Sequence, residues 1–149
     1  MQTRRNWLAL VIATSILAAT DYSKALDVAA DVVEIQREDA SEYGIIVEES
    51  KTDFACSDFF IRLPRAYLEA DLSAVNLINY SKCEVTLNVG LQLHREKLGD
   101  GEKSDLPWVQ FCIFPEAGMK TTAVASYSKG DVVTRIIDID ILGELSECH

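Results

Sequence analysis

The stretch CEVTLNVGLQL, residues 83–93, alternates apolar and polar side chains without a break. The apolar set is Cys83, Val85, Leu87, Val89, Leu91 and Leu93, and the polar set is Glu84, Thr86, Asn88, Gly90 and Gln92. A period of two residues places each set on its own face of a β-strand, whereas a helix would scatter both sets around its circumference. We therefore expect a half-buried strand whose apolar set points into a core and whose polar set faces solvent.

Six further segments are rich in β-branched or aromatic residues and are bounded by turn formers. They span residues 44–48, 59–63, 72–80, 108–114, 121–127 and 131–141. No helical pattern separates them. This repetition predicts an all-β domain, a mainly antiparallel β-sandwich of about seven strands.

Two other segments have weaker patterns. In residues 26–39, Leu26, Ala29 and Val33 lie on one helical stripe, but Val33 and Ile35 also fit a strand. We expect a short N-terminal helix here that leads into the first strand. The polar segment 95–107, with its Asp100-Gly101 turn, is expected to be a mobile connection.

The N-terminus has the pattern of an export signal. Residues 7–20 carry no charge, and as a helix they would reach only ~21 Å, short of the ~30 Å of a hydrocarbon core. Basic residues precede this run, and Ser23 and Ala25 supply the small side chains that a signal peptidase requires. We expect residues 1–25 to be a cleaved signal peptide and residues 26–149 to form one domain. Cleavage after Ala18 or Ala19, an uncleaved anchor and an N-terminal helix of the domain are the alternatives.

The beginning of this signal resembles the twin-arginine export signal of bacteria. In TRRNWL, Thr3 precedes the pair Arg4 and Arg5, and Trp7 and Leu8 follow after one further residue. Ala9 departs from the lysine often found at the next position. The resemblance implies passage to the periplasm, and the general export route to the periplasm or outside remains the alternative.

The chain is acidic, with 24 Asp and Glu against 14 Lys and Arg and a net charge of −10. Loss of residues 1–25 removes three basic residues and one acidic residue, which makes the charge −12. Such a surface repels nucleic acid and anionic lipid headgroups and favours a cation or a protein partner. Once the signal is removed, no membrane-spanning segment is expected.

Four cysteines, Cys56, Cys83, Cys112 and Cys148, follow the predicted signal. An even number in an exported chain, with no C-x-x-C spacing, indicates two disulfides with three possible pairings. If strands 83–93 and 108–114 form a hairpin, Cys112 lies about six residues from Cys83. At ~3.3 Å per residue that is ~20 Å, against a Cα limit of ~7 Å, so this pairing is disfavoured.

The chemical signals in the chain are weak. No G-x-S-x-G motif is present, and of the two histidines His94 falls on the polar face of its strand while His149 is the last residue. Asp138 and Asp140 share one strand face, which we expect to be solvated. We therefore expect no catalytic residue, cofactor or metal site. A calcium site at Asp138, Asp140 and Glu144 and a soft-metal site at His94, His149, Met119 and a cysteine are the less favoured interpretations.

The sequence therefore predicts an exported, disulfide-stapled, acidic β domain with a non-catalytic binding or envelope-structural role. The alternative is a periplasmic metal-binding protein or a small hydrolase that uses acidic residues or His94. No family resemblance extends over the domain itself.

Overall fold

The computed structural model describes residues 30–52 and 55–143, which form nine strands and one short helix. The chain divides into two compact units, and all of these elements belong to the second, Asp31–His149. In order they are β1 (Asp31–Gln36), η1 (Arg37–Tyr43), β2 (Ile46–Lys51), β3 (Ser57–Arg62), β4 (Ala66–Tyr67), β5 (Ala70–Ser81), β6 (Glu84–Gly90), β7 (Trp108–Ile113), β8 (Met119–Lys129) and β9 (Val132–Leu142).

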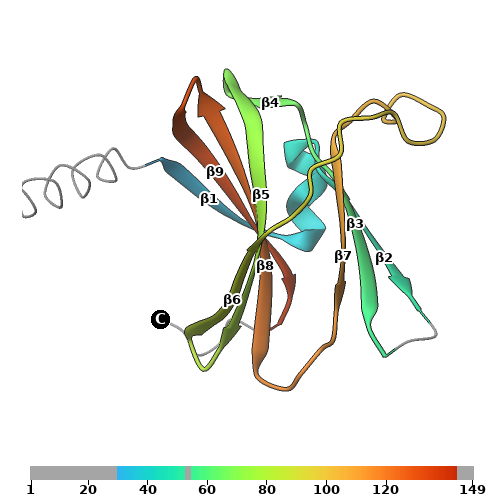
Figure 1. Ribbon diagram of the computed structural model, residues 1–149, viewed down its shortest axis with the longest axis vertical. Helices are drawn as coiled ribbons and strands as arrows, with labels where there is room; N and C mark the ends of the chain where they lie inside the picture. The colour runs from blue at the N-terminus through green and yellow to red at the C-terminus, as the bar shows by residue number, and fades with distance from the viewer. Residues whose placement is uncertain (1–29, 53–54, 144–149) are drawn as a thin grey trace, which may run out of the picture. The chain divides into compact units, whose positions relative to one another are not determined.

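The strands form two packed sheets (Figure 1). The six-stranded sheet, sheet A, has the order β1-β9-β8-β5-β4, and β6 pairs with the other half of the long strand β5. The three-stranded sheet, sheet B, has the order β2-β3-β7. All pairs are antiparallel except β1 with β9, which is parallel. The predicted all-β sandwich is confirmed, with β1 and β4 added to the seven expected strands.

The expected short helix is present, but it follows the first strand instead of preceding it: Asp31–Gln36 form β1, and η1 begins at Arg37. Val33 and Ile35 alternate in β1, where Ile35 lies opposite Ile139 and is buried. A strand forms here because β9 supplies a hydrogen-bonding edge and an apolar face, which outweigh a weak helical stripe. Residues 26–29 lie outside the described residues.

The short helix η1 follows β1 and connects sheet A to sheet B. Its Ala40 is buried, and Gly44, with φ of 72°, ends it by donating its N–H to Ala40 and Ser41 carbonyls. Among the described residues, no helix is long and apolar enough to cross a membrane.

The core lies between the inner faces of the two sheets. The ring of Phe59 on β3 stacks on that of Phe111 on β7, with centroids 5.7 Å apart. From the opposite sheet, Tyr127 is fully buried and donates its hydroxyl to the Pro64 carbonyl at 3.3 Å. Burial raises the pKa of Tyr127, so this phenol stays a neutral donor.

Two-residue turns hold the β4–β5 and β5–β6 hairpins. Leu68 and Glu69 form the first turn and Lys82 and Cys83 the second, and all four have positive φ between 46° and 67°. Two successive residues of positive φ give a turn whose twist matches that of the flanking strands. The second turn therefore fixes β6 against β5 rather than against β7.

Strand β6 exists as predicted from residues 83–93, but its predicted burial is wrong. All residues of β6 are exposed, including Leu87 at 43% and Val89 at 40%. Only Leu91 and Leu93, beyond the end of β6, pack partly against the core. The reason is topological: β6 pairs with β5 in sheet A, and the narrower sheet B does not cover it.

We expect Leu87→Ala to cost less than ~1 kcal/mol in unfolding free energy, because its side chain already contacts water. Ile139→Ala, at a fully buried position of β9, should cost ~2–5 kcal/mol from lost burial and the cavity left behind. Urea midpoints of the two variants measure the difference. A loss at position 87 as large as that at 139 would show that β6 is covered.

Candidate functional site

The inner face of sheet A is left uncovered at β6. In the antiparallel pairing of β5 with β6, Val89 lies opposite Leu77 and Leu87 lies opposite Asn79. Residues paired in this way point to the same face of a sheet. Because Leu77 is buried on the inner face, Leu87 and Val89 also point to that face, yet both are about 40% exposed. The inner face of sheet A, which is buried at Leu77, is thus exposed to solvent at β6.

A cleft of about 390 Å³ opens at this point between the two sheets. Its walls are Leu77, Asn79, Thr86 and Leu87 from sheet A, Cys112 and Ile113 from β7, and Phe114, Glu116 and Met119 from the β7–β8 connection and the start of β8. We call this the β6–β7 cleft. Phe114 stands at its mouth and is 62% exposed. The lining combines apolar side chains with exposed polar groups.

Two polar residues in the wall of the β6–β7 cleft, Asn79 and Thr86, are hydrogen-bonded within the domain. The Asn79 Oδ1 atom accepts a hydrogen bond from Thr121 at 2.9 Å, and Thr86 donates its hydroxyl to the Asn79 carbonyl at 3.2 Å. These bonds fix the wall across three strands. Among the described residues, Glu116 is the one charged side chain that lines the cleft. The wall therefore combines apolar side chains with exposed polar groups and one carboxylate.

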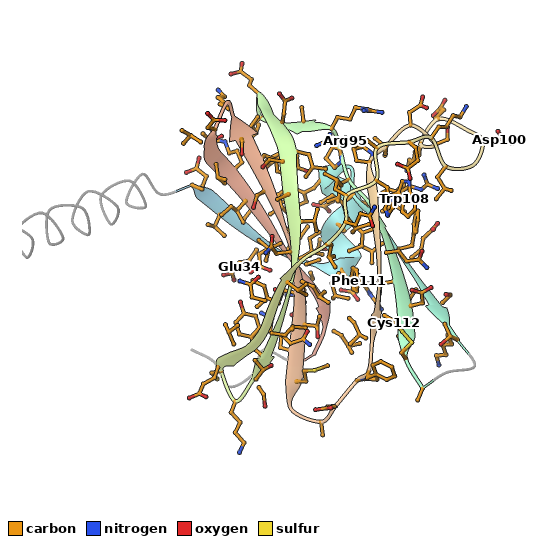
Figure 2. The ribbon with its side chains drawn as sticks, viewed as in Figure 1. Glu34, Arg95, Asp100, Trp108, Phe111 and Cys112 are labelled. Carbon is orange, nitrogen blue, oxygen red and sulfur yellow. A yellow bond between two sulfur atoms is a disulfide. The ribbon has the colours of Figure 1, made fainter. Side chains whose placement is uncertain are left out.

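The Cys56–Cys112 disulfide braces the β7 side of the cleft (Figure 2). It joins β7 to the segment before β3 with a Cα–Cα distance of 5.8 Å, and Thr52 donates its hydroxyl to the Cys56 carbonyl at 3.0 Å. It adds a covalent link to the antiparallel pairing that places Ile113 opposite Ser57. The disulfide thus lies directly beside the site.

The structure confirms that Cys83 does not pair with Cys112, although the hairpin assumed for that inference is wrong. β6 pairs with β5 and β7 with β3, and only an isolated bridge joins His94 to Trp108. Cys83 is itself disulfide-bonded. Cys148 lies outside the described residues and is the one other cysteine of the chain.

His94 is held by structural contacts. Its ring stacks on Trp108 with centroids 4.0 Å apart, and its Nδ1 lies 2.9 Å from Glu96 Oε1. Met119, the other predicted soft ligand that the structure describes, lies in the wall of the cleft. Within residues 30–52 and 55–143, no three His, Cys, Asp or Glu side chains are close enough to hold a metal. His149 and Glu144 are outside these ranges.

The expectation of a solvated acidic face on β9 is wrong for Asp140, which is only 8% exposed. Burial raises the pKa of Asp138 and Asp140, and the negative charges of Glu34 and Glu38 act in the same direction. Lys120 opposes both shifts. The two carboxyl groups do lie on the face opposite the buried isoleucines, as the alternation predicted.

Arginine side chains bond to the loop 95–107, whose expected mobility stays a prediction. Arg62 donates to the carbonyls of Leu98 at 3.3 Å and Lys103 at 3.1 Å, and Arg65 donates to that of Asp105. A polar depression of about 400 Å³ lies beneath the loop, lined in part by Glu48 and Arg62. Because the Arg62 guanidinium is already bonded to the loop, this depression offers a ligand less than the β6–β7 cleft does.

We expect Asp140→Asn to become more stable relative to the natural protein as pH rises. A folded-state pKa above the ordinary value of 3.8 means that the stability contributed by Asp140 is full below pH 3.8 and is lost as pH rises through the folded-state pKa. Chemical denaturation across a pH series measures the difference.

The exposed Asp131→Asn variant is the control for removing one negative charge. A difference between Asp140→Asn and the natural protein that stays constant with pH would contradict the raised pKa.

The sequence missed the β6–β7 cleft because its walls come from segments distant in the chain. Leu87 was assigned to the core, and Phe114 carried no signal beyond its place at a strand end.

Comparisons of the chain with family models, with curated proteins and with solved structures gave no match. The geometry of the β6–β7 cleft is therefore the main guide to function.

Proposed function

We propose that this chain is an exported, non-catalytic binding domain, and that its β6–β7 cleft binds an extended apolar segment of a protein partner. The observation that carries the proposal is the exposure of Leu87 and Phe114 in the lining of one cleft, with the exposed Val89 next to Leu87 on the same strand face. Exposed apolar side chains that gather at a cleft mark interaction sites, whereas isolated ones do not.

The charge of the domain narrows the chemistry of the partner. Glu116 at the rim and the acidic composition of the chain favour a segment that carries a lysine or arginine beside its apolar residues. An extended segment fits better than a helix, because the open space lies between two strands.

The alternative role, in metal binding or hydrolysis through acidic residues or His94, has less support. The His94 ring stacks on Trp108 and its Nδ1 contacts Glu96. Asp138 and Asp140 of β9 lie on the outer face of sheet A, away from the cleft. The proposal therefore assigns binding to the apolar walls alone.

Site-specific photocrosslinking tests the cleft. A benzoylphenylalanine at position 114, inside the cleft, should crosslink one protein of the exported fraction of the producing cells. The same residue at position 60 replaces another phenylalanine, on the outer face of sheet B, and should not. Leu87→Ser should remove the product formed from position 114, whereas the neighbouring Asn88→Ser should leave it. Equal products from positions 60 and 114, or a product that survives Leu87→Ser, would overturn the proposal.

Export is part of the proposal, supported by the signal-like residues 1–25 and by a disulfide compatible with an oxidising compartment. The intact mass of the exported protein, measured without reduction, should match residues 26–149 less the four hydrogens lost in two disulfides. Because Cys56 pairs with Cys112, peptide mapping should join Cys83 to Cys148. A mass that includes Trp7, or two alkylatable thiols, would contradict this expectation.

A further inference from the structure

The outward edge of β6 presents main-chain groups that no other described strand pairs. Leu91 donates its N–H to the Val75 carbonyl at 2.8 Å, in the same register that pairs Val89 with Leu77. Main-chain groups of residues two apart point to the same side of a strand. Leu87, Val89 and Leu91 therefore direct theirs to β5, and Asn88 and Gly90 direct theirs outward.

This edge lacks the usual protection against strand pairing. Lysine, proline and charged side chains commonly block the edges of sheets. β6 carries no lysine or proline, and Glu84 is its one charged residue. By contrast, the edge strand β2 carries two glutamates and a lysine, and the first residue of β7 already bonds to His94.

A second copy of β6 fits this edge in one antiparallel register. If a two-fold axis passes beside Asn88, the outward groups of Asn88 face those of Asn88 in the second copy. Leu87 then lies directly opposite Val89 of the second copy, on the inner face, and Val89 lies opposite Leu87. Directly opposed apolar pairs stabilise antiparallel strands, and no charged residue lies between Thr86 and Gly90 to oppose the contact.

We propose that two copies of this chain associate through β6, in an isologous antiparallel pairing centred on Asn88. The pairing joins the two six-stranded sheets edge to edge and brings the two β6–β7 clefts next to each other. This inference goes beyond partner binding, because the second copy occupies the edge of β6 and not the cleft.

Sedimentation velocity over a protein concentration series tests the pairing. The natural protein should shift from monomer to dimer, and raising the salt concentration should favour the dimer because each copy is strongly acidic. Asn88→Pro removes the outward N–H and should weaken association by at least about tenfold. Asn88→Ala keeps that N–H and is the matched control, since both variants lose the 2.9 Å side-chain bond from Asn76. Circular dichroism confirms that both variants fold.

A second pair of variants tests the register even if proline disturbs β6. Leu87→Lys with Val89→Lys places like charges opposite each other across the two-fold axis and should give a monomer. Leu87→Lys with Val89→Glu places lysine opposite glutamate and should restore the dimer.

A natural protein that stays monomeric at every concentration would overturn the inference, and so would a dimer that Asn88→Pro leaves intact. Slow hydrogen exchange at the Asn88 and Gly90 amides in the dilute monomer would also overturn it, because another part of the chain would then cover the edge. These measurements report self-association alone, so their failure leaves the crosslinking test of the cleft unaffected.

Discussion

The unequal width of the two sheets determines where this domain is closed and where it is open. Sheet B has three strands and can bury only part of the inner face of the six-stranded sheet A. Where the sheets overlap, Phe59, Phe111 and Tyr127 fill the space between them and are buried. Beyond that overlap the same apolar face continues onto β6. A fully buried core and an exposed apolar strand thus result from one architectural constraint.

A covalent link and two polar links lie at the β6–β7 cleft. The Cys56–Cys112 bridge secures the end of β7, and Asn79 with its two hydroxyl partners secures β6 and β8. A crosslink of this kind stabilises mainly by restricting the unfolded chain. At this position it also keeps the β7 side of the cleft from moving away from β3. The disulfide and these hydrogen bonds therefore stabilise both walls of the β6–β7 cleft.

The sequence predicted the fold class well because alternation depends on local geometry. Every strand that it predicted is present, since β-branched and aromatic residues favour a strand whichever neighbour it acquires. The burial of a side chain, by contrast, depends on which strand pairs with its own and which sheet covers it. The alternation in β6 shows that Leu87 and Val89 share a face, but only the pairing with β5 shows that sheet B leaves this face uncovered. For Asp140 the prediction was wrong in the opposite direction: it was expected to face solvent but is buried, because elements from distant parts of the chain cover it.

An acidic domain with an uncharged apolar strand combines long-range repulsion with short-range attraction. At physiological ionic strength charges are screened beyond about 8 Å, so the net charge slows encounters but does not prevent close contact. The nearest charge along β6, on Glu84, lies four residues before Asn88, or about 13 Å at the rise of a strand, which is beyond this screening distance. Contacts made by residues 86–90 are therefore decided by shape, hydrogen bonding and apolar area. Acidic charge can keep the rest of the surface soluble while this one strand remains able to bind.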